Sequence, residues 1–176
     1  RARREGVPFI TVDSGVDSDA PLSYIATDNV SASKVAAEAL AKLMGNKGKA
    51  LLMSFVAGSQ TAAEREQGFK QGISQFRDVQ LIGTQYSLAD ATRAMSIMDN
   101  VLTATPDLAG VFTSEEKTGA GVARQLEISG KAKDIKFVAF DASDALIQAL
   151  QKGIVDALVV QQPYQMGYLG VEFAVK

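Results

Sequence analysis

This 176-residue chain contains no cysteine and no histidine. The absence of cysteine excludes disulfides, thiol catalysis and cysteine metal sites. The absence of histidine excludes the common zinc sites and leaves carboxylates, lysine or tyrosine for general acid–base catalysis. No pair of carboxylates is marked for such catalysis, so we predict that the protein is not an enzyme and holds no metal.

An excess of either charge is also missing. The chain has 18 Lys and Arg against 20 Asp and Glu, for a net charge of −2. This balance gives no basic surface for nucleic acid, so we expect no nucleic-acid partner. No apolar run approaches the ~20 residues of a membrane helix. No signal peptide opens the sequence, and we expect the leader of an exported protein to lie outside this stretch.

Cofactor-binding motifs are missing as well. Neither the Gly-x-x-x-x-Gly-Lys-Ser/Thr phosphate loop nor the Gly-x-Ser-x-Gly elbow occurs. The stretch Gly119-Ala-Gly121-Val-Ala-Arg124 lacks the third glycine of the dinucleotide motif and lies inside a predicted helix. We therefore predict no cofactor and interpret these glycines as sites of close helix packing.

What is present is a regular alternation of short apolar runs and helical spacing. Strands are predicted at residues 8–13, 22–26, 50–56, 79–85, 109–113, 135–140 and 156–160. Helices are predicted from a cap at Asp28, Asn29 or Ser31 to a stop at Gly45, at residues 61–77, 90–104, 118–129 and 143–152, and after Pro163. This alternation implies parallel strands joined by right-handed crossovers, so the predicted fold class is α/β, a doubly wound parallel sheet with helices on both faces.

Arg65 is the most unusual residue of the stretch 58–69, which reads as a turn followed by a helix start. Thr61 and Glu64 have the spacing of a capping box at that helix. A cation in the first turns opposes the helix dipole. One interpretation is a surface arginine paired with Glu64 or Glu66, and the other is a guanidinium held beyond the preceding strand to donate to a polar ligand.

Polar side chains follow several predicted strands at the point where each strand ends. They are Asp13, the loop at residues 58–65, Glu115 with Glu116, Asp141 and Gln161. The carboxyl ends of parallel strands meet at one edge of a sheet, and ligands bind in the crevice beyond that edge. The sequence therefore predicts a polar binding site there.

Some of these residues also have a structural interpretation that the sequence leaves open. Asp141 can be the N-cap of the following helix, although Ser143 or Asp144 can cap it instead. Glu115 can belong to the acidic first turn of its helix, which the dipole favours. Gln161 can be a hinge residue.

The stretch Ala-Ala-Glu-Arg-Glu-Gln-Gly-Phe at residues 62–69 resembles the Ala-x-x-Arg-x-x-Gly-Phe signature of periplasmic sugar-binding proteins of the ribose-binding type, the receptors of sugar ABC transporters. Further motifs follow in the order of that family: Val12-Asp13, Ile25-Ala-Thr-Asp-Asn29, Leu102-Thr-Ala-Thr-Pro-Asp107, Val138-Ala-Phe-Asp141 and Gln162-Pro-Tyr-Gln-Met-Gly167. The resemblance implies a type I periplasmic-binding-protein fold and a sugar ligand held between two lobes.

The resemblance also implies a division of the chain. Residues 1–27 match the tail of lobe one, residues 28–161 a complete lobe two, and residues 162–176 a helix that returns to lobe one. The first strands of lobe one have no counterpart here. We expect this fragment to bind sugar poorly and to self-associate through an exposed strand edge near residues 8–12 and the face of the helix after Pro163.

Ligand contacts carry over from the resemblance to Asp13, Arg65, Asp141 and Gln161, where the residue types agree. Three further ligand positions depart from the ribose-binder pattern: Ser14 stands for an arginine, Ala89 for a phenylalanine and Glu115 for an asparagine. These changes shift the site toward accepting hydrogen bonds. Another pentose, a hexose, a polyol or an amine-bearing ligand therefore remains as plausible as ribose.

The resemblance implies a membrane permease as partner and a periplasmic or otherwise extracytoplasmic location. The alternative is the effector-binding domain of a LacI-type transcription repressor, which shares the fold. That family has a Gly-His pair and a Val-Pro-x-Asp-like segment where this chain reads Gly45-Asn-Lys-Gly48 and Lys131-Ala-Lys-Asp134. These differences favour the transport receptor.

Overall fold

The structure, a computed structural model, describes residues 2–175. In chain order the elements are a 3-10 helix (Ala2–Glu5), β1 (Thr11–Val12), β2 (Tyr24–Ile25), α1 (Asn29–Leu43), β3 (Lys47–Ser54), α2 (Gln60–Ile73), β4 (Asp78–Tyr86), α3 (Ala91–Ala104), β5 (Leu108–Thr113), α4 (Glu116–Ile128), β6 (Lys136–Phe140), α5 (Asp144–Gln151), β7 (Ala157–Val159) and α6 (Pro163–Ala174). Within this part of the chain, no helix is long and apolar enough to cross a membrane.

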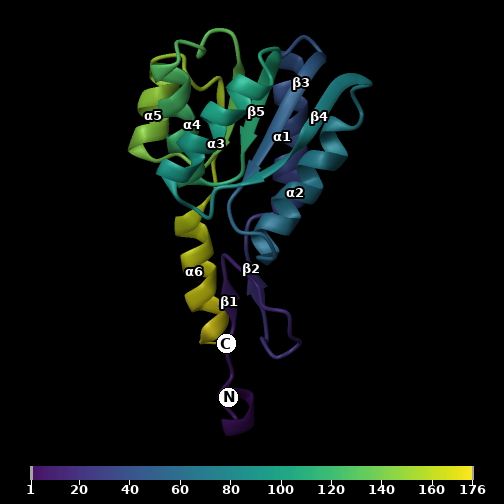
Figure 1. The fold of residues 1–176 in the computed structure, drawn as a ribbon. Helices are drawn as coiled ribbons and strands as arrows, with labels where there is room; N and C mark the ends of the chain where they lie inside the picture. Colours follow the sequence, from purple (N-terminus) through teal and green to yellow (C-terminus); the bar gives the residue numbers. More distant parts are fainter. Residues whose placement is uncertain (1, 176) are drawn as a thin grey trace.

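The main body is a five-stranded parallel sheet in the order β4-β3-β5-β6-β7. Helices α1 and α2 pack on one face, and α3, α4 and α5 pack on the other (Figure 1). The predicted α/β fold with helices on both faces is therefore confirmed.

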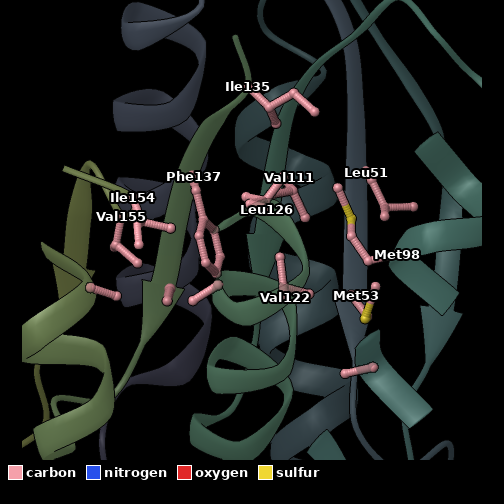
Figure 2. Close-up of a cluster of buried hydrophobic side chains, with 14 of the residues drawn as sticks. Leu51, Met53, Met98, Val111, Val122, Leu126, Ile135, Phe137, Ile154 and Val155 are labelled. Carbon is pink, nitrogen blue, oxygen red and sulfur yellow. The ribbon is translucent and has the colours of Figure 1, made fainter. Parts of the chain in front are cut away.

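Both faces of the sheet are buried, which explains why the strands read as continuous apolar runs. In β3, Leu51 and Met53 point to the side of α3 and α4, where they belong to the cluster that contains Met98 and Leu126 (Figure 2). The alternate residues of β3 point to the side of α1 and α2. On that side Phe112 stacks on Phe69 with ring centroids 4.5 Å apart.

The glycines of α4 allow the close helix packing that we predicted from the sequence. A Cβ at Gly121 would overlap the carbonyl oxygen of Ala91 and lie 2.8 Å from the Cβ of Ala94, both in α3. Gly119 has Leu146 and Thr113 at 3.1 and 3.0 Å from the same ideal position. The two helices can approach this closely only because α4 has no side chain there.

Strands β1 and β2 form a separate two-stranded parallel sheet, with Val12 opposite Ile25. Helix α6 packs beside this small sheet, and the group lies below the main body in Figure 1. The buried Gly170 of α6 lets the helix approach, since a Cβ there would lie 3.1 Å from Val12 Cγ2.

Several predicted boundaries were wrong. The strand expected at residues 8–13 is only Thr11–Val12, and it is not buried: it packs against β2 and α6, and Val12 remains 41% exposed. The strand expected at 50–56 is Lys47–Ser54. The helix expected at 61–77 ends at Ile73, where the chain turns through Ser74 and Phe76 before β4.

Candidate ligand-binding site

The carboxyl ends of β3, β5 and β6 meet at the edge of the main sheet that faces the small sheet (Figure 1). Helix α2 begins just beyond β3 and brings Arg65 to this edge. This is the edge at which the sequence predicts a binding site from its strand ends.

Arg65 is buried, with only 3% of its surface exposed. Its Nε donates to Asn29 Oδ1 at 2.8 Å, and its Nη1 donates to the Ser114 carbonyl oxygen at 2.7 Å. The guanidinium carbon lies 3.8 Å from the centre of the Phe140 ring, in cation–π contact. The interpretation of Arg65 as a surface residue paired with Glu64 or Glu66 is therefore wrong.

The predicted capping box of α2 is also wrong. The N-cap is Ser59, whose hydroxyl accepts from the Ala62 N–H at 3.2 Å. Thr61 lies one step into the helix and donates instead to Ser14 Oγ at 3.2 Å. Glu64 accepts from Asn29 Nδ2 at 2.9 Å, so this glutamate orients the amide that holds Arg65.

Carboxylates surround the buried cation. Burial lowers the pKa of the Arg65 guanidinium, and Asp141, Asp13, Glu115 and Glu64 oppose this effect, in that order. Within residues 2–175, the Nη2 group of Arg65 makes no hydrogen bond. Three of the five N–H donors of the guanidinium, two on Nη2 and one on Nη1, thus remain beside a set of acceptors.

Asp13 and Asp141 share one local geometry. Both have left-handed backbone conformations, with φ of 71° and 75°. Asp13 follows β1 and donates its N–H to the Ile25 carbonyl at 2.9 Å, and Asp141 follows β6 and donates to Val159 at 2.8 Å. A non-glycine residue in this conformation is strained by ~1 kcal/mol or more, and such residues gather at functional sites.

Gln161 links the two parts of the molecule. Its Nε2 donates to Asp141 Oδ1, and its Oε1 accepts from Thr27 Oγ1 at 2.7 Å. Thr27 follows β2 and Gln161 follows β7, so the two residues lie on the two segments that run between the small sheet with α6 and the main body (Figure 1). Asp141 does not cap α5, because Ser143 accepts the Leu146 N–H.

A hollow of about 540 Å³ lies between α6 and the strand ends. Three of the predicted site residues line it: Asp13, Asp141 and Gln161. Its other walls include Met166 and Pro163 of α6. Arg65 is not among the residues that line this hollow.

Ser14 and Ala89 lie apart from this hollow. Ser14 lines a second hollow of about 670 Å³, formed by residues 14–19 and 58–60. Ala89 lies between β4 and α3 in a left-handed conformation with φ of 55°, and its N–H donates to Ser87 Oγ at 3.2 Å.

Glu115 is the N-cap of α4 and not part of its first turn. Its Oε1 accepts from the Lys117 N–H at 2.9 Å, and its Oε2 accepts from the Thr118 N–H at 3.0 Å. Glu116 then forms the acidic first turn and lines the 540 Å³ hollow. Whether Glu115 also contacts a ligand stays a prediction.

Three contributors to the site were missed by sequence reasoning. Phe140 supplies the ring under Arg65, Asn29 accepts from its Nε, and Thr27 fixes Gln161. Asn29 was expected only as a possible helix cap, a role that Asp28 takes by accepting the Ser31 N–H at 3.0 Å. The sequence did contain a signal for the role of Asn29: it directly follows Asp28, which can cap the helix and so leaves the asparagine side chain available for another contact.

The sequence matches the family described as periplasmic binding protein domain over residues 1–176. Ribose import binding protein RbsB of Salmonella typhimurium is 34% identical over 175 residues, which are 99% of this chain and 58% of that protein. RbsB of Escherichia coli K12 is 33% identical with the same coverage.

Solved structures agree with this match. An ABC transporter solute-binding protein from Agrobacterium vitis, bound with α-D-tagatopyranose, superposes with a TM-score of 0.95 at 38% identity, over 99% of this chain and 62% of that one. A carbohydrate transporter solute-binding protein from Agrobacterium radiobacter, in complex with D-arabinose, gives 0.92 at 31% identity, over 97% and 60%. The chain thus spans only 58% to 62% of the length of these relatives. The chain belongs to the periplasmic binding protein domain family.

Proposed function

We propose that this chain is part of an extracytoplasmic receptor that captures a monosaccharide or similar polyol and delivers it to the membrane permease of an ABC transporter. Capture is non-catalytic and takes place between two lobes. Residues 28–161 form one complete lobe in this proposal, and residues 1–27 and 162–176 belong to the other. The hollow lined by Asp13, Asp141 and Gln161 is the cleft between them.

The observation that carries the proposal is the pairing of acceptors and a buried donor at the strand ends. The carboxylates of Asp13 and Asp141 line the hollow and can accept hydrogen bonds from ligand hydroxyls. Arg65 Nη2 can donate hydrogen bonds to ligand oxygens, because the bonds to Asn29 and Ser114 use Nε and Nη1. A polyol needs this chemistry, because each of its hydroxyls both donates and accepts. The family match and the import receptors among the relatives support a transport receptor over the repressor effector domain.

Calorimetry on the longer protein that contains this chain tests the proposal. The ligands are D-ribose, D-arabinose, D-allose, D-fucose, D-tagatose and D-glucosamine, which sample the pentose, hexose, ketose and amino-sugar classes. We expect at least one of them to bind, and Asp141→Ala to weaken it by ~2–4 kcal/mol, because buried donors lose their charged acceptor. Exposed Asp134, which forms an ion pair with Lys131 three residues away, provides the control variant Asp134→Ala. Binding by none of the six, or equal loss in both variants, would overturn the proposal.

Self-association of the fragment belongs to the same proposal. Helix α6 exposes an apolar stripe, with Tyr164 at 84%, Tyr168 at 58% and Val171 at 67% exposure. In the longer protein, lobe one would cover this face. Residues 1–176 alone should therefore dimerise in light scattering and bind sugar only at millimolar concentrations or above, because half of the cleft is missing. A strict monomer with micromolar binding would show that the division into lobes is wrong.

A further inference from the structure

A buried chain of hydrogen bonds joins Ala89 to Glu115. No sequence motif predicts that these two residues are connected. The Ala89 N–H donates to Ser87 Oγ at 3.2 Å, Ser87 Oγ lies 2.6 Å from Thr118 Oγ1, and Thr118 Oγ1 donates to Glu115 Oε2 at 2.9 Å. Ser87 and Thr118 are both fully buried. The chain therefore crosses the interior between the β4–α3 loop and the start of α4.

Every proton in this chain has a fixed direction. The Glu115 carboxylate only accepts, so the single hydroxyl proton of Thr118 points to it. Ser87 then donates to Thr118 across 2.6 Å, because its other acceptor, the Ser54 carbonyl oxygen, lies much farther away at 3.4 Å. With its own proton committed, Ser87 accepts from Ala89. All donors point toward Glu115.

The same contacts limit what Glu115 can offer to a ligand. A carboxylate has about four acceptor positions. The Thr118 hydroxyl and N–H occupy those of Oε2, and the Lys117 N–H occupies one on Oε1. About one position remains, on Oε1, and its direction is set by the other bonds.

The loop at the other end of the chain is held just as firmly. Leu88 and Ala89 are both left-handed, with φ of 60° and 55°, a costly conformation for residues with a side chain. The Leu88 N–H donates to the Phe55 carbonyl at 2.8 Å, and Ser87 accepts the Ala89 N–H. Ser87 therefore helps to maintain the strained turn that presents Ala89.

We propose that Ser87 and Thr118 are positioning residues that make Glu115 and the 88–89 turn one specificity-determining unit for the sugar. The proposal rests on the proposed function. It explains why these two hydroxyls are fully buried: they hold one acceptor of Glu115 in a fixed direction. Sugars that place a hydroxyl or amine donor at that point are favoured over their epimers.

The test compares Thr118→Val with the conservative Thr118→Ser in the longer protein, using the same six sugars. Thr113→Val is the matched control, because Thr113 Oγ1 is buried and has no hydrogen-bond partner within residues 2–175. We expect Thr118→Val to change the affinity ratio between the two best sugars by about tenfold, and Thr118→Ser and Thr113→Val to leave it unchanged. In a Glu115→Ala background, which has no side-chain acceptor for the Thr118 hydroxyl, the effect of Thr118→Val should largely disappear.

Three outcomes separate the possibilities. Equal affinity ratios in Thr118→Val and Thr113→Val, with sugar still bound, would overturn the positioning role and leave the proposed function intact. Binding of no sugar by the wild-type protein would overturn both. If Thr118→Val does not fold, Ser87→Ala carries the same expectation, because it removes the donor to Thr118 and the acceptor for Ala89.

Discussion

Replacement of Arg65 by alanine should destabilise the protein even in the absence of ligand. Arg65→Ala removes the donors to Asn29 Oδ1 and to the buried Ser114 carbonyl, as well as the contact with the Phe140 ring. Each buried acceptor left without a donor costs ~1–3 kcal/mol, and the ring contact adds ~0.5–2 kcal/mol. Relief of the guanidinium's own burial offsets part of this sum.

We expect a net loss of ~2–4 kcal/mol in the free energy of unfolding, which is a large part of a typical domain's stability. Urea unfolding followed by circular dichroism measures it. Arg65→Lys should fall in between, because one ammonium group retains the charge and cannot reach both acceptors in the geometry of a planar fork.

The control is Arg124→Ala. Arg124 also lies on a helix, but its side chain is 60% exposed and forms an ion pair with Glu127 three residues away. Such pairs contribute at most ~0.5 kcal/mol. If Arg65→Ala were to unfold at the same urea concentration as Arg124→Ala, the buried hydrogen bonds would not hold Arg65 in the way described, and the site would lose its anchor.

Three further predictions follow from individual contacts. Gly121→Ala should destabilise the protein by ~1–3 kcal/mol in urea unfolding, because its Cβ meets the Ala91 backbone, while Gly167→Ala on α6, with no atom within 4 Å, should be neutral or stabilising. The hydrogen bond from the Ser31 N–H lowers the pKa of Asp28 below its ordinary value of 3.8. The stability that this cap contributes is therefore present above pH 3.8 and is lost as the pH falls below it. Asp28→Asn keeps a cap and should flatten that part of the curve of unfolding free energy against pH. Glu115→Gln should reorder sugar preferences in a thermal-shift screen, and identical rankings would contradict this expectation. The same substitution should lower the melting temperature, because the amide NH₂ replaces one carboxylate oxygen and cannot accept the Thr118 or Lys117 N–H that this oxygen accepts. An unchanged melting temperature would contradict this second expectation.

The fold was predictable because its signal is local and repeated. In β3, Leu51 and Leu52 point to opposite faces of a sheet that is covered on both, so the buried run at residues 50–53 is apolar throughout and is recognised from sequence alone. The short strand β1 gave the same signal, but it packs against α6 and β2 rather than inside a sheet covered on both faces, and so the expected buried strand is partly exposed. Apolar runs predict strands and do not predict what covers them.

The environment of Arg65 could not be predicted in the same way. Its two hydrogen-bond partners lie 36 residues before it and 49 residues after it, on segments whose approach depends on the assembled sheet. Local spacing therefore left the surface and buried interpretations open. Local rules failed at the helix start too, where Thr61 matched the capping pattern and Ser59, two residues earlier, makes the cap.

The left-handed aspartates show a further limit of sequence reasoning. The resemblance of the motifs that end in Asp13 and Asp141 predicted both residues as ligand contacts. The sequence analysis did not predict their positive φ angles. Those angles arise because each N–H bonds to the carbonyl of the neighbouring strand while the chain turns away from the sheet. Tertiary pairing, rather than local propensity, sets this geometry.

The most direct test of the receptor account is a crystal structure of the longer protein with its best-binding sugar from the calorimetric panel. The account predicts ring hydroxyls within hydrogen-bond distance, ~2.6–3.2 Å, of the Asp13 and Asp141 carboxylates and of Arg65 Nη2, in the cleft beyond β6. A sugar bound elsewhere, or bound in this cleft without contact to Arg65 or Asp141, would contradict it.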